Sequence, residues 1–203
     1  MISMAKKTIL VLIILILLAF LALNILGANS VEVYIDGENV SAKTNTLSNI
    51  DRESMNLEIC DYTFEVMDNT SANITTLKEG INDICSRYGL ENVNINIDSS
   101  IGENQIPILV EVDGTSMLPT LENGQDVLLN KTHDIQVGDI VVAKSDEYGR
   151  IIKRVDEING NSIHLVSDNK NVSYEYINGE LYLVKGISTW VDISDINGVA
   201  ISY

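Results

Sequence analysis

Two residues of the sequence, Ser116 and Lys153, have the types and surroundings that peptide-bond hydrolysis would need. A serine hydroxyl is a weak nucleophile unless a nearby base takes its proton. A lysine can be that base when burial among apolar side chains lowers its pKa from about 10.4 towards neutrality. The pair predicts a Ser/Lys dyad, with Ser116 as nucleophile and Lys153 as general base. The structural alternative for Ser116 is a turn serine before a Pro-Thr segment.

Lys153 lies in an otherwise apolar run, Gly-Arg-Ile-Ile-Lys-Arg-Val, at residues 149–155. If this run is a strand, alternation places Ile151, Lys153 and Val155 on one face. A lysine on the same face as Ile and Val is unusual for an exposed strand, but taken alone it is more typical of an edge strand, where lysines prevent pairing between molecules.

Four segments in order resemble the signal peptidase I family, within the wider group that includes self-cleaving repressors. The Ser-Met-Leu-Pro-Thr-Leu segment at residues 116–121 is similar to the nucleophile box, residues 137–142 to a Gly-Asp-Ile-Val-Val strand, residues 152–155 to the lysine box, and Ser167-Asp168-Asn169 to a Gly-Asp-Asn box. The resemblance covers about residues 108–185, with 37 residues separating Ser116 from Lys153.

The resemblance implies a mechanism and a set of supporting residues. Ser116 would attack the scissile carbonyl, and neutral Lys153 would accept its proton, return it to the leaving amine and activate water. Asp168 would support the site structurally. Met117 would pack against the dyad, and a strand carrying Ile108, Val110 and Val112 would pair with an extended substrate. The family accepts small residues at the first and third positions before the cut.

The chain departs from the family pattern at two positions. Gly114 stands where some members have a serine that helps to hold the oxyanion. The backbone N–H of Ser116 is therefore the expected oxyanion donor, with help from Thr115. Ser167 replaces the glycine of the later box.

No metal or other cofactor is expected, because His133 and His164 are isolated and neither has ligand candidates at metal-binding spacing. Both histidines are more typical of surface or turn positions. Cys60 and Cys85 leave a disulfide and two free thiols equally open.

Residues 8–26 carry no charge and predict a membrane anchor. A helix of these 19 residues would be about 28 Å long, close to the hydrocarbon thickness of a bilayer. Lys6 and Lys7 precede the segment, so the N-terminus is expected in the cytoplasm and residues 28–203 outside, on a single-pass protein of the cell membrane. A cleaved secretory signal is the alternative, but signal segments are usually shorter.

The charge excludes nucleic acid as a partner. Two of the 13 Lys and Arg precede residue 28, whereas all 29 Asp and Glu follow it, so the exported part is more acidic than the whole chain at −16. Such a surface repels phosphates and offers no basic patch to anionic lipids. The N-terminal helix is then the expected membrane attachment.

The remaining pattern predicts a mainly β fold in two parts. Residues 31–105 are expected to form a small α+β region of unknown role. Apolar and polar residues alternate, as in strands, at residues 31–36, 55–67 and 93–98. Residues 37–54 are polar, and residues 75–88 have the apolar spacing of a helix. Short β-rich runs in residues 106–203 predict a small antiparallel barrel or sandwich. The resemblance implies that this domain has the fold of a signal peptidase. These runs are residues 108–112, 126–129, 139–144, 150–155, 162–166 and 180–185.

The sequence thus predicts a membrane-anchored serine endopeptidase that cleaves signal peptides or similar segments of exported proteins, with residues 1–30 as cytoplasmic tip and anchor. Ser116 follows Leu26 by 90 residues, far more than in ordinary signal peptidases. A specialised envelope or self-processing Ser/Lys protease therefore stays open. So does an anchored, non-catalytic adhesion protein, which five Asn-x-Ser/Thr sequons would suit.

Overall fold

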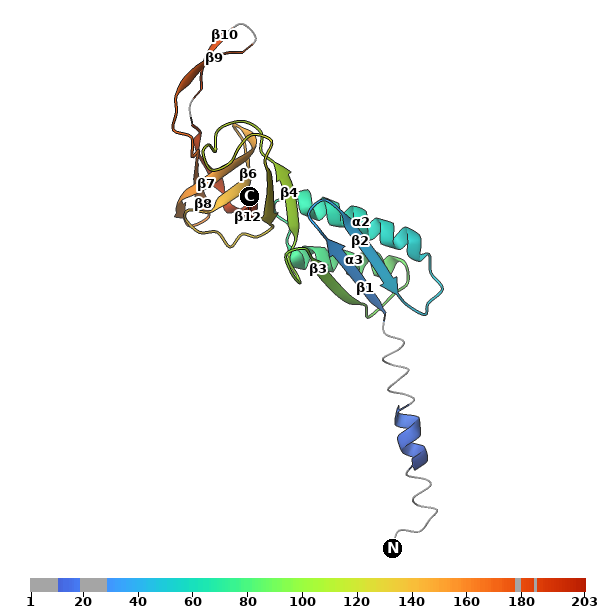
Figure 1. Cartoon of the computed structure of the whole chain (residues 1–203). Coiled ribbons are helices and arrows are strands. Elements are labelled where there is room, and N and C mark those ends of the chain that lie inside the picture. The colour runs from blue at the N-terminus through green and yellow to red at the C-terminus, as the bar shows by residue number, and fades with distance from the viewer. Residues whose placement is uncertain (1–10, 19–28, 178–179, 185) are drawn as a thin grey trace.

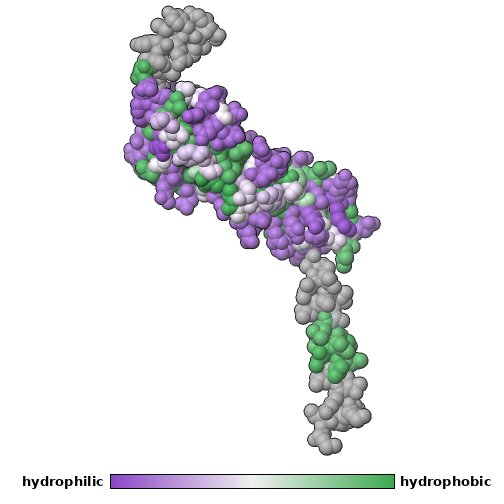
Figure 2. Space-filling model, in the orientation of Figure 1, coloured by the Kyte–Doolittle hydropathy of each residue, from purple (hydrophilic) through white to green (hydrophobic). Residues whose placement is uncertain are grey.

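The computed structural model describes residues 11–18, 29–177, 180–184 and 186–203. In it the protein is mainly β, with a curled antiparallel sheet and a few helices (Figure 1). Hydrophilic side chains cover much of the face shown in Figure 2, whereas residues 11–18 are hydrophobic. The elongated shape places a small α+β part beside the larger sheet.

The α+β part packs two helices against one face of a three-stranded sheet. Its elements are β1 (Ser30–Ile35), β2 (Val40–Asn45), α2 (Arg52–Asp68), α3 (Ile74–Arg87) and β3 (Asn94–Ser99). The strand order is β2-β1-β3, with β1 antiparallel to β2 and parallel to β3. Alternate residues of β1 are buried in the same core as Ile59 of α2 and Leu77 of α3. This burial confirms the strand expected at residues 31–36 and the helix at 75–88.

Helix α2 corrects the alternation seen at residues 55–67, which favoured a strand. Its buried residues are Met55, Ile59, Thr63, Val66 and Met67, which follow the period of a helix rather than that of a strand. Leu57, which completes the alternation, is 61% exposed. Asp51 caps the start of the helix, because its side-chain oxygen accepts a hydrogen bond from the Ser54 N–H. This capping residue was not recognised in the sequence.

The larger sheet has seven strands in the order β11-β8-β7-β6-β12-β5-β4, and every neighbouring pair is antiparallel. Its strands are β4 (Pro107–Glu111), β5 (Asp126–Asn130), β6 (Ile140–Ser145), β7 (Gly149–Asn159), β8 (Ser162–Val166), β11 (Ser188–Asp192) and β12 (Ile196–Ser202). A separate hairpin pairs β9 (Ser173–Ile177) with β10 (Glu180–Val184), and a short 3-10 helix, η1 (Ile193–Asp195), precedes β12. Strands β2, β9, β11 and β12 were not among the strands expected from the sequence.

The two parts share one hydrophobic core and several polar contacts. The core runs from β1, α2 and α3 into β4, β5 and β6. Buried Lys131 donates from Nζ to Met67 O at the end of α2 (3.4 Å) and to Asn197 Oδ1 (2.7 Å). The Leu109 N–H donates to Gly37 O over 3.1 Å. The α+β part is therefore fixed against the edge of the seven-stranded sheet.

The expected anchor at residues 8–26 lies mostly outside the described residues. Residues 11–18 are helical, with exposed apolar side chains. Within the described part of the chain, no helix combines the length and apolar character needed to cross a membrane.

Candidate active site

The structure brings Ser116 and Lys153 into direct contact. Lys153 Nζ lies 2.8 Å from Ser116 Oγ, and it also donates to Ile152 O at 2.8 Å. Lys153 is 3% exposed, between buried Ile151 and Val155 on the same face of β7. Lys153 therefore lies on the buried face of the sheet, on the same side as Ile151 and Val155, as the alternation in the sequence predicts.

Burial lowers the pKa of Lys153 from 10.5 to about 8. Removal from water disfavours the ammonium form, so a useful fraction of neutral amine exists near neutral pH. Burial also lowers the pKa of Lys131 to about 8, but that amine contacts a carbonyl and an amide rather than a hydroxyl. Of the two buried lysines, only Lys153 thus has both a lowered pKa and a serine hydroxyl within hydrogen-bond distance.

The turn that carries Ser116 is held from two sides. Within it, the Leu118 N–H donates to Thr115 O (3.2 Å) and the Leu121 N–H donates to Met117 O (3.0 Å). From outside, Asn169 donates its backbone N–H to Ser116 O and its side-chain Nδ2 to Thr115 O, both at 2.9 Å. Asn169 therefore fixes the peptide groups on both sides of the Ser116 Cα.

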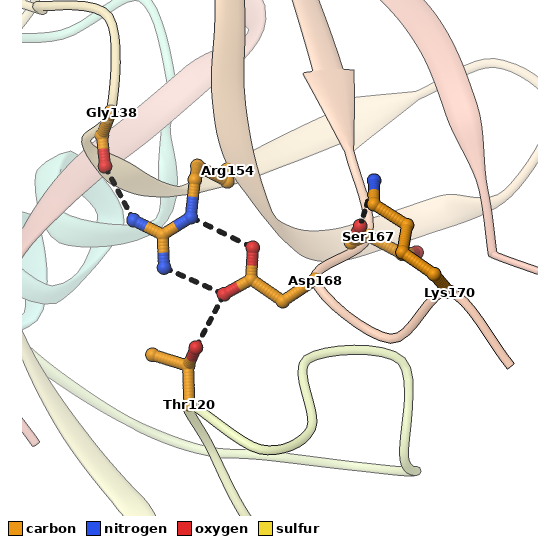
Figure 3. A network of polar contacts seen from close by, with 6 residues as sticks. All are labelled: Thr120, Gly138, Arg154, Ser167, Asp168 and Lys170. Carbon is orange, nitrogen blue, oxygen red and sulfur yellow. Dashed lines mark hydrogen bonds and ion pairs between the residues drawn. The ribbon is translucent and has the colours of Figure 1, made fainter.

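Asp168 connects the segments that carry Thr120 and Arg154 (Figure 3). It accepts two hydrogen bonds from Arg154, Nε to Oδ1 at 2.7 Å and Nη2 to Oδ2 at 2.6 Å. It also accepts the Thr120 hydroxyl at 2.6 Å, and Arg154 Nη1 donates to Gly138 O at 2.6 Å. Arg154 holds the pKa of Asp168 below its usual value, chiefly by hydrogen bonding. Asp168 links the turn after Ser116 to the residue next to Lys153, a structural contact of the kind that the resemblance implies.

Ser167 fits the loop although the family has glycine at this position. It is 1% exposed, its hydroxyl accepts the Ile187 N–H at 2.9 Å, and its own N–H donates to Ile187 O at 2.9 Å. Lys170 Nζ donates to Ser167 O at 2.8 Å (Figure 3). The substituted serine is therefore hydrogen-bonded and leaves Asp168 with its partners.

The backbone before Ser116 explains the glycine that departs from the family. Gly114 has a φ of +91°, a conformation that other residues adopt only with strain. Its N–H donates to Asn123 Oδ1 at 2.6 Å. No hydrogen bond of the Ser116 N–H to another described residue occurs, so this group can serve as an oxyanion donor. The Thr115 side chain is exposed, and the residue lines the cleft beside Ser116.

The model of the peptidase S24-like family matches residues 80–187, which include Ser116, Lys153 and Asp168. The chain belongs to this family. A comparison with curated proteins gave no match. The peptidase S24-like family includes Ser/Lys peptidases related to signal peptidase I and to self-cleaving repressors, so the resemblance seen in the sequence is confirmed. Membership implies serine peptidase activity for this S24-like protein.

A cleft of about 430 Å³ opens beside the dyad of this S24-like peptidase. It is lined by Ser116, Lys153, Ile187, part of β4 and residues 150–152 of β7. Strand β4 is at one end of the sheet order and pairs only with β5 among the described strands. An extended peptide could add to this edge next to the hydroxyl of Ser116.

Of the four residues expected to bind substrate, two line hollows along β4 and two are buried in the core. Val110 is half-buried and lines the cleft beside Ser116, whereas Ile108 lines a second hollow farther along β4. Val112 and Met117 are buried in the core, at 2% and 0% exposed, and line neither hollow. They therefore belong to the core rather than to the lining of the cleft.

The two cysteines are both free thiols, Cys60 half-buried on α2 and Cys85 buried on α3. The two histidines are half-buried rather than fully exposed. His133 Nε2 contacts Thr70 O and Ile196 O, and the ring of His164 stacks on Trp190. Neither histidine contacts the dyad.

Sequence reasoning missed two residues of the site, Arg154 and Asn169. Both lie in the segments that were recognised, one position from Lys153 and one from Asp168. Their polar side chains in those segments were the available signal, but their partners could be named only from the fold.

Proposed function

We propose that this S24-like protein is a membrane-anchored serine endopeptidase that cleaves signal peptides or similar segments of exported proteins outside the cytoplasm. The observation that carries the proposal is the 2.8 Å contact between buried Lys153 Nζ and Ser116 Oγ. The geometry suits proton transfer from the hydroxyl to a neutral amine.

The proposed chemistry has two half-reactions. Ser116 Oγ attacks the scissile carbonyl while Lys153 takes its proton, and the Ser116 N–H donates to the resulting oxyanion. The C–N bond breaks as Lys153 returns the proton to the leaving amine, which leaves an acyl ester on Ser116. Lys153 then takes a proton from water, whose oxygen attacks the ester, and the proton returns to Ser116 as the acid is released.

The substrate is proposed to bind as an extended strand along β4, with the residues before the cut beside Val110 and Glu111. Both residues line the dyad cleft, and β4 is an edge strand. Backbone pairing suits preproteins of varied sequence, because affinity then comes largely from main-chain hydrogen bonds.

Membrane attachment and location are proposed from the sequence. Residues 8–26 are uncharged and apolar, and the lysines that precede them favour a cytoplasmic N-terminus. The acidic remainder, residues 28–203, would then be outside, with exported proteins rather than nucleic acid as its partners.

The test is cleavage of a purified preprotein by the full chain in detergent, with products identified by mass spectrometry. Ser116→Ala and Lys153→Met are each expected to lower kcat/KM by at least about 10³-fold. Lys131→Met is the matched control, because it removes a second buried lysine that lies away from the dyad. This variant should still cleave the preprotein.

Three outcomes separate the alternatives. Equal cleavage by the wild type and Ser116→Ala would reject the dyad. Wild-type protein that cleaves only itself would favour a self-processing protease. Absence of Ser116-dependent cleavage of any tested protein would favour the non-catalytic surface protein.

A further inference from the structure

The cleft beside the dyad continues into a second hollow that reaches the α+β part. This second hollow, of about 370 Å³, is lined by the end of α2 on one side and by β4 on the other. The two hollows share Val110, Glu111 and Arg150. A substrate strand that extends away from Ser116 along β4 would therefore run towards α2.

Gly37 limits how far a substrate can pair with the β4 backbone. The Leu109 N–H points away from β5 and already donates to Gly37 O at 3.1 Å. A side chain at Gly37 would press on Leu128 and on the Leu109 backbone, so glycine permits this close approach. In an antiparallel pair, outward-facing groups occur on alternate residues, which leaves Glu111 as the next such residue of β4. Substrate residues beyond Glu111 must then be held through their side chains.

The second hollow has an apolar wall and a charged rim. Phe64 of α2 is 43% exposed and lines the hollow together with Ile108 and Val110 of β4. At the rim, Arg150 Nη1 lies 3.6 Å from Asp68 Oδ1, and both side chains are largely exposed. This arrangement suits an apolar side chain, because its burial against Phe64 leaves the charged groups in water.

We propose that the end of α2, through Phe64, forms the far subsite of the substrate cleft and takes one apolar side chain before the cut. From Asp113 to Leu109 an extended chain spans about 13 Å, so the side chain belongs to a residue roughly four positions from the cleaved bond. The proposal rests on the proposed peptidase function. It gives the α+β part a role in selecting substrates.

The test uses the full chain in detergent and synthetic peptides of one sequence, with Ala at the first and third positions before the cut. A single Leu replaces Ser at each of positions four to seven in turn. Wild-type protein is expected to prefer one Leu peptide, near position four, roughly tenfold in kcat/KM over the Ser peptide. Phe64→Ala should reduce that ratio below about threefold.

Two further variants make the test specific. Leu57→Ala truncates an exposed apolar residue of the same helix that lines neither hollow, and it should keep the wild-type ratio. Phe64→Glu should shift the preference at the same position from Leu towards Lys. Circular dichroism shows whether each variant is folded.

The outcomes distinguish this proposal from the one on which it rests. Ser116-dependent cleavage with the same Leu preference in the wild type and in both Phe64 variants overturns the subsite alone. Ser116-dependent cleavage without any positional Leu preference also overturns it. Absence of Ser116-dependent cleavage overturns the peptidase function and the subsite together.

Discussion

In the proposed reaction, the amine of Lys153 must be neutral to accept the proton of Ser116, and this requirement fixes the pH dependence. Burial lowers its pKa to about 8, so the neutral fraction grows as pH rises through that value. We expect kcat/KM to rise about tenfold per pH unit on the acidic side and to level off above about pH 8. Initial rates on one peptide across the pH range measure this profile, and a rate that is flat between about pH 6 and 9 would contradict Lys153 as the base.

Asp168 provides a second test at the scale of single residues. Asp168→Asn removes one acceptor of the paired Arg154 hydrogen bonds in a site where Asp168 is 12% exposed. We expect a loss of about 1–3 kcal/mol in the free energy of unfolding, because a partly buried guanidinium loses an acceptor. Urea denaturation followed by circular dichroism measures the loss.

The exposed Arg150–Asp68 pair is the matched comparison for that stability measurement. Its atoms are 3.6 Å apart, and its side chains are 52% and 85% exposed. Asp68→Asn should cost less than about 1 kcal/mol, because water and salt screen exposed ion pairs. Equal losses in the two variants would argue against a structural role for the Asp168 contacts.

Sequence alone could supply the dyad but only part of its surroundings. Ser116 and Lys153 were predictable because segment order and an apolar strand identify them without coordinates. The two hydrogen bonds of Asn169 and the forked contact of Arg154 depend on loops brought together by folding. No spacing in the chain encodes these contacts.

At the scale of elements, the packing of α2 on α3 depends on Gly80. A Cβ at this position would collide with the ring of Tyr62, whose hydroxyl donates to Thr76 O at 3.0 Å. We expect Gly80→Ala to destabilise the protein by about 1–3 kcal/mol, although alanine favours helices more than glycine does. Denaturation midpoints measure the change.

A double variant separates this collision from helix propensity. In the background of Tyr62→Ala, Gly80→Ala should stabilise by up to about 1 kcal/mol, since the obstructing ring is gone. Destabilisation of similar size in both backgrounds would show that the ring contact does not explain the glycine.

The elements themselves were predictable where one signal dominated. Helix α3 has apolar residues at helical spacing, and β8 (Ser162–Val166) alternates between turns. The prediction for α2 was wrong because Met55, Leu57 and Ile59 have the alternating spacing of a strand. Only the exposure of Leu57 distinguishes it from its two buried neighbours. Strand β2 was missed because its half-exposed sequence, Val-Ser-Ala-Lys-Thr-Asn, contains little apolar signal.

At the scale of the whole molecule, the shared core predicts cooperative unfolding. Trp190, the only tryptophan, reports on the seven-stranded sheet, whereas far-ultraviolet circular dichroism is weighted to the helices. We expect the same denaturant midpoint from both signals, because one core cluster joins α2 and α3 to β4, β5 and β6, and a second cluster, which contains Val191 of β11, shares strand β6 with it. Lys131→Met should lower both midpoints together, and two separate midpoints would show that the parts unfold independently.

The join between the two parts was beyond sequence analysis. Gly37 and Leu109 meet across 72 positions, and Lys131 and Met67 across 64. Each residue has an ordinary local explanation, as a turn glycine, a strand residue or a surface lysine. The contacts between them form only when the α+β part packs against the seven-stranded sheet.

The closure of β4 by Gly37 also bears on how copies of the protein behave when crowded together. Unpaired strand edges with apolar side chains are where identical chains join into sheets and aggregate. Since the Leu109 N–H is occupied, the edge open to a second copy is restricted to the stretch around Glu111, whose charge repels the same residue of another molecule. The contact with Gly37 thus also limits backbone pairing between two copies along β4.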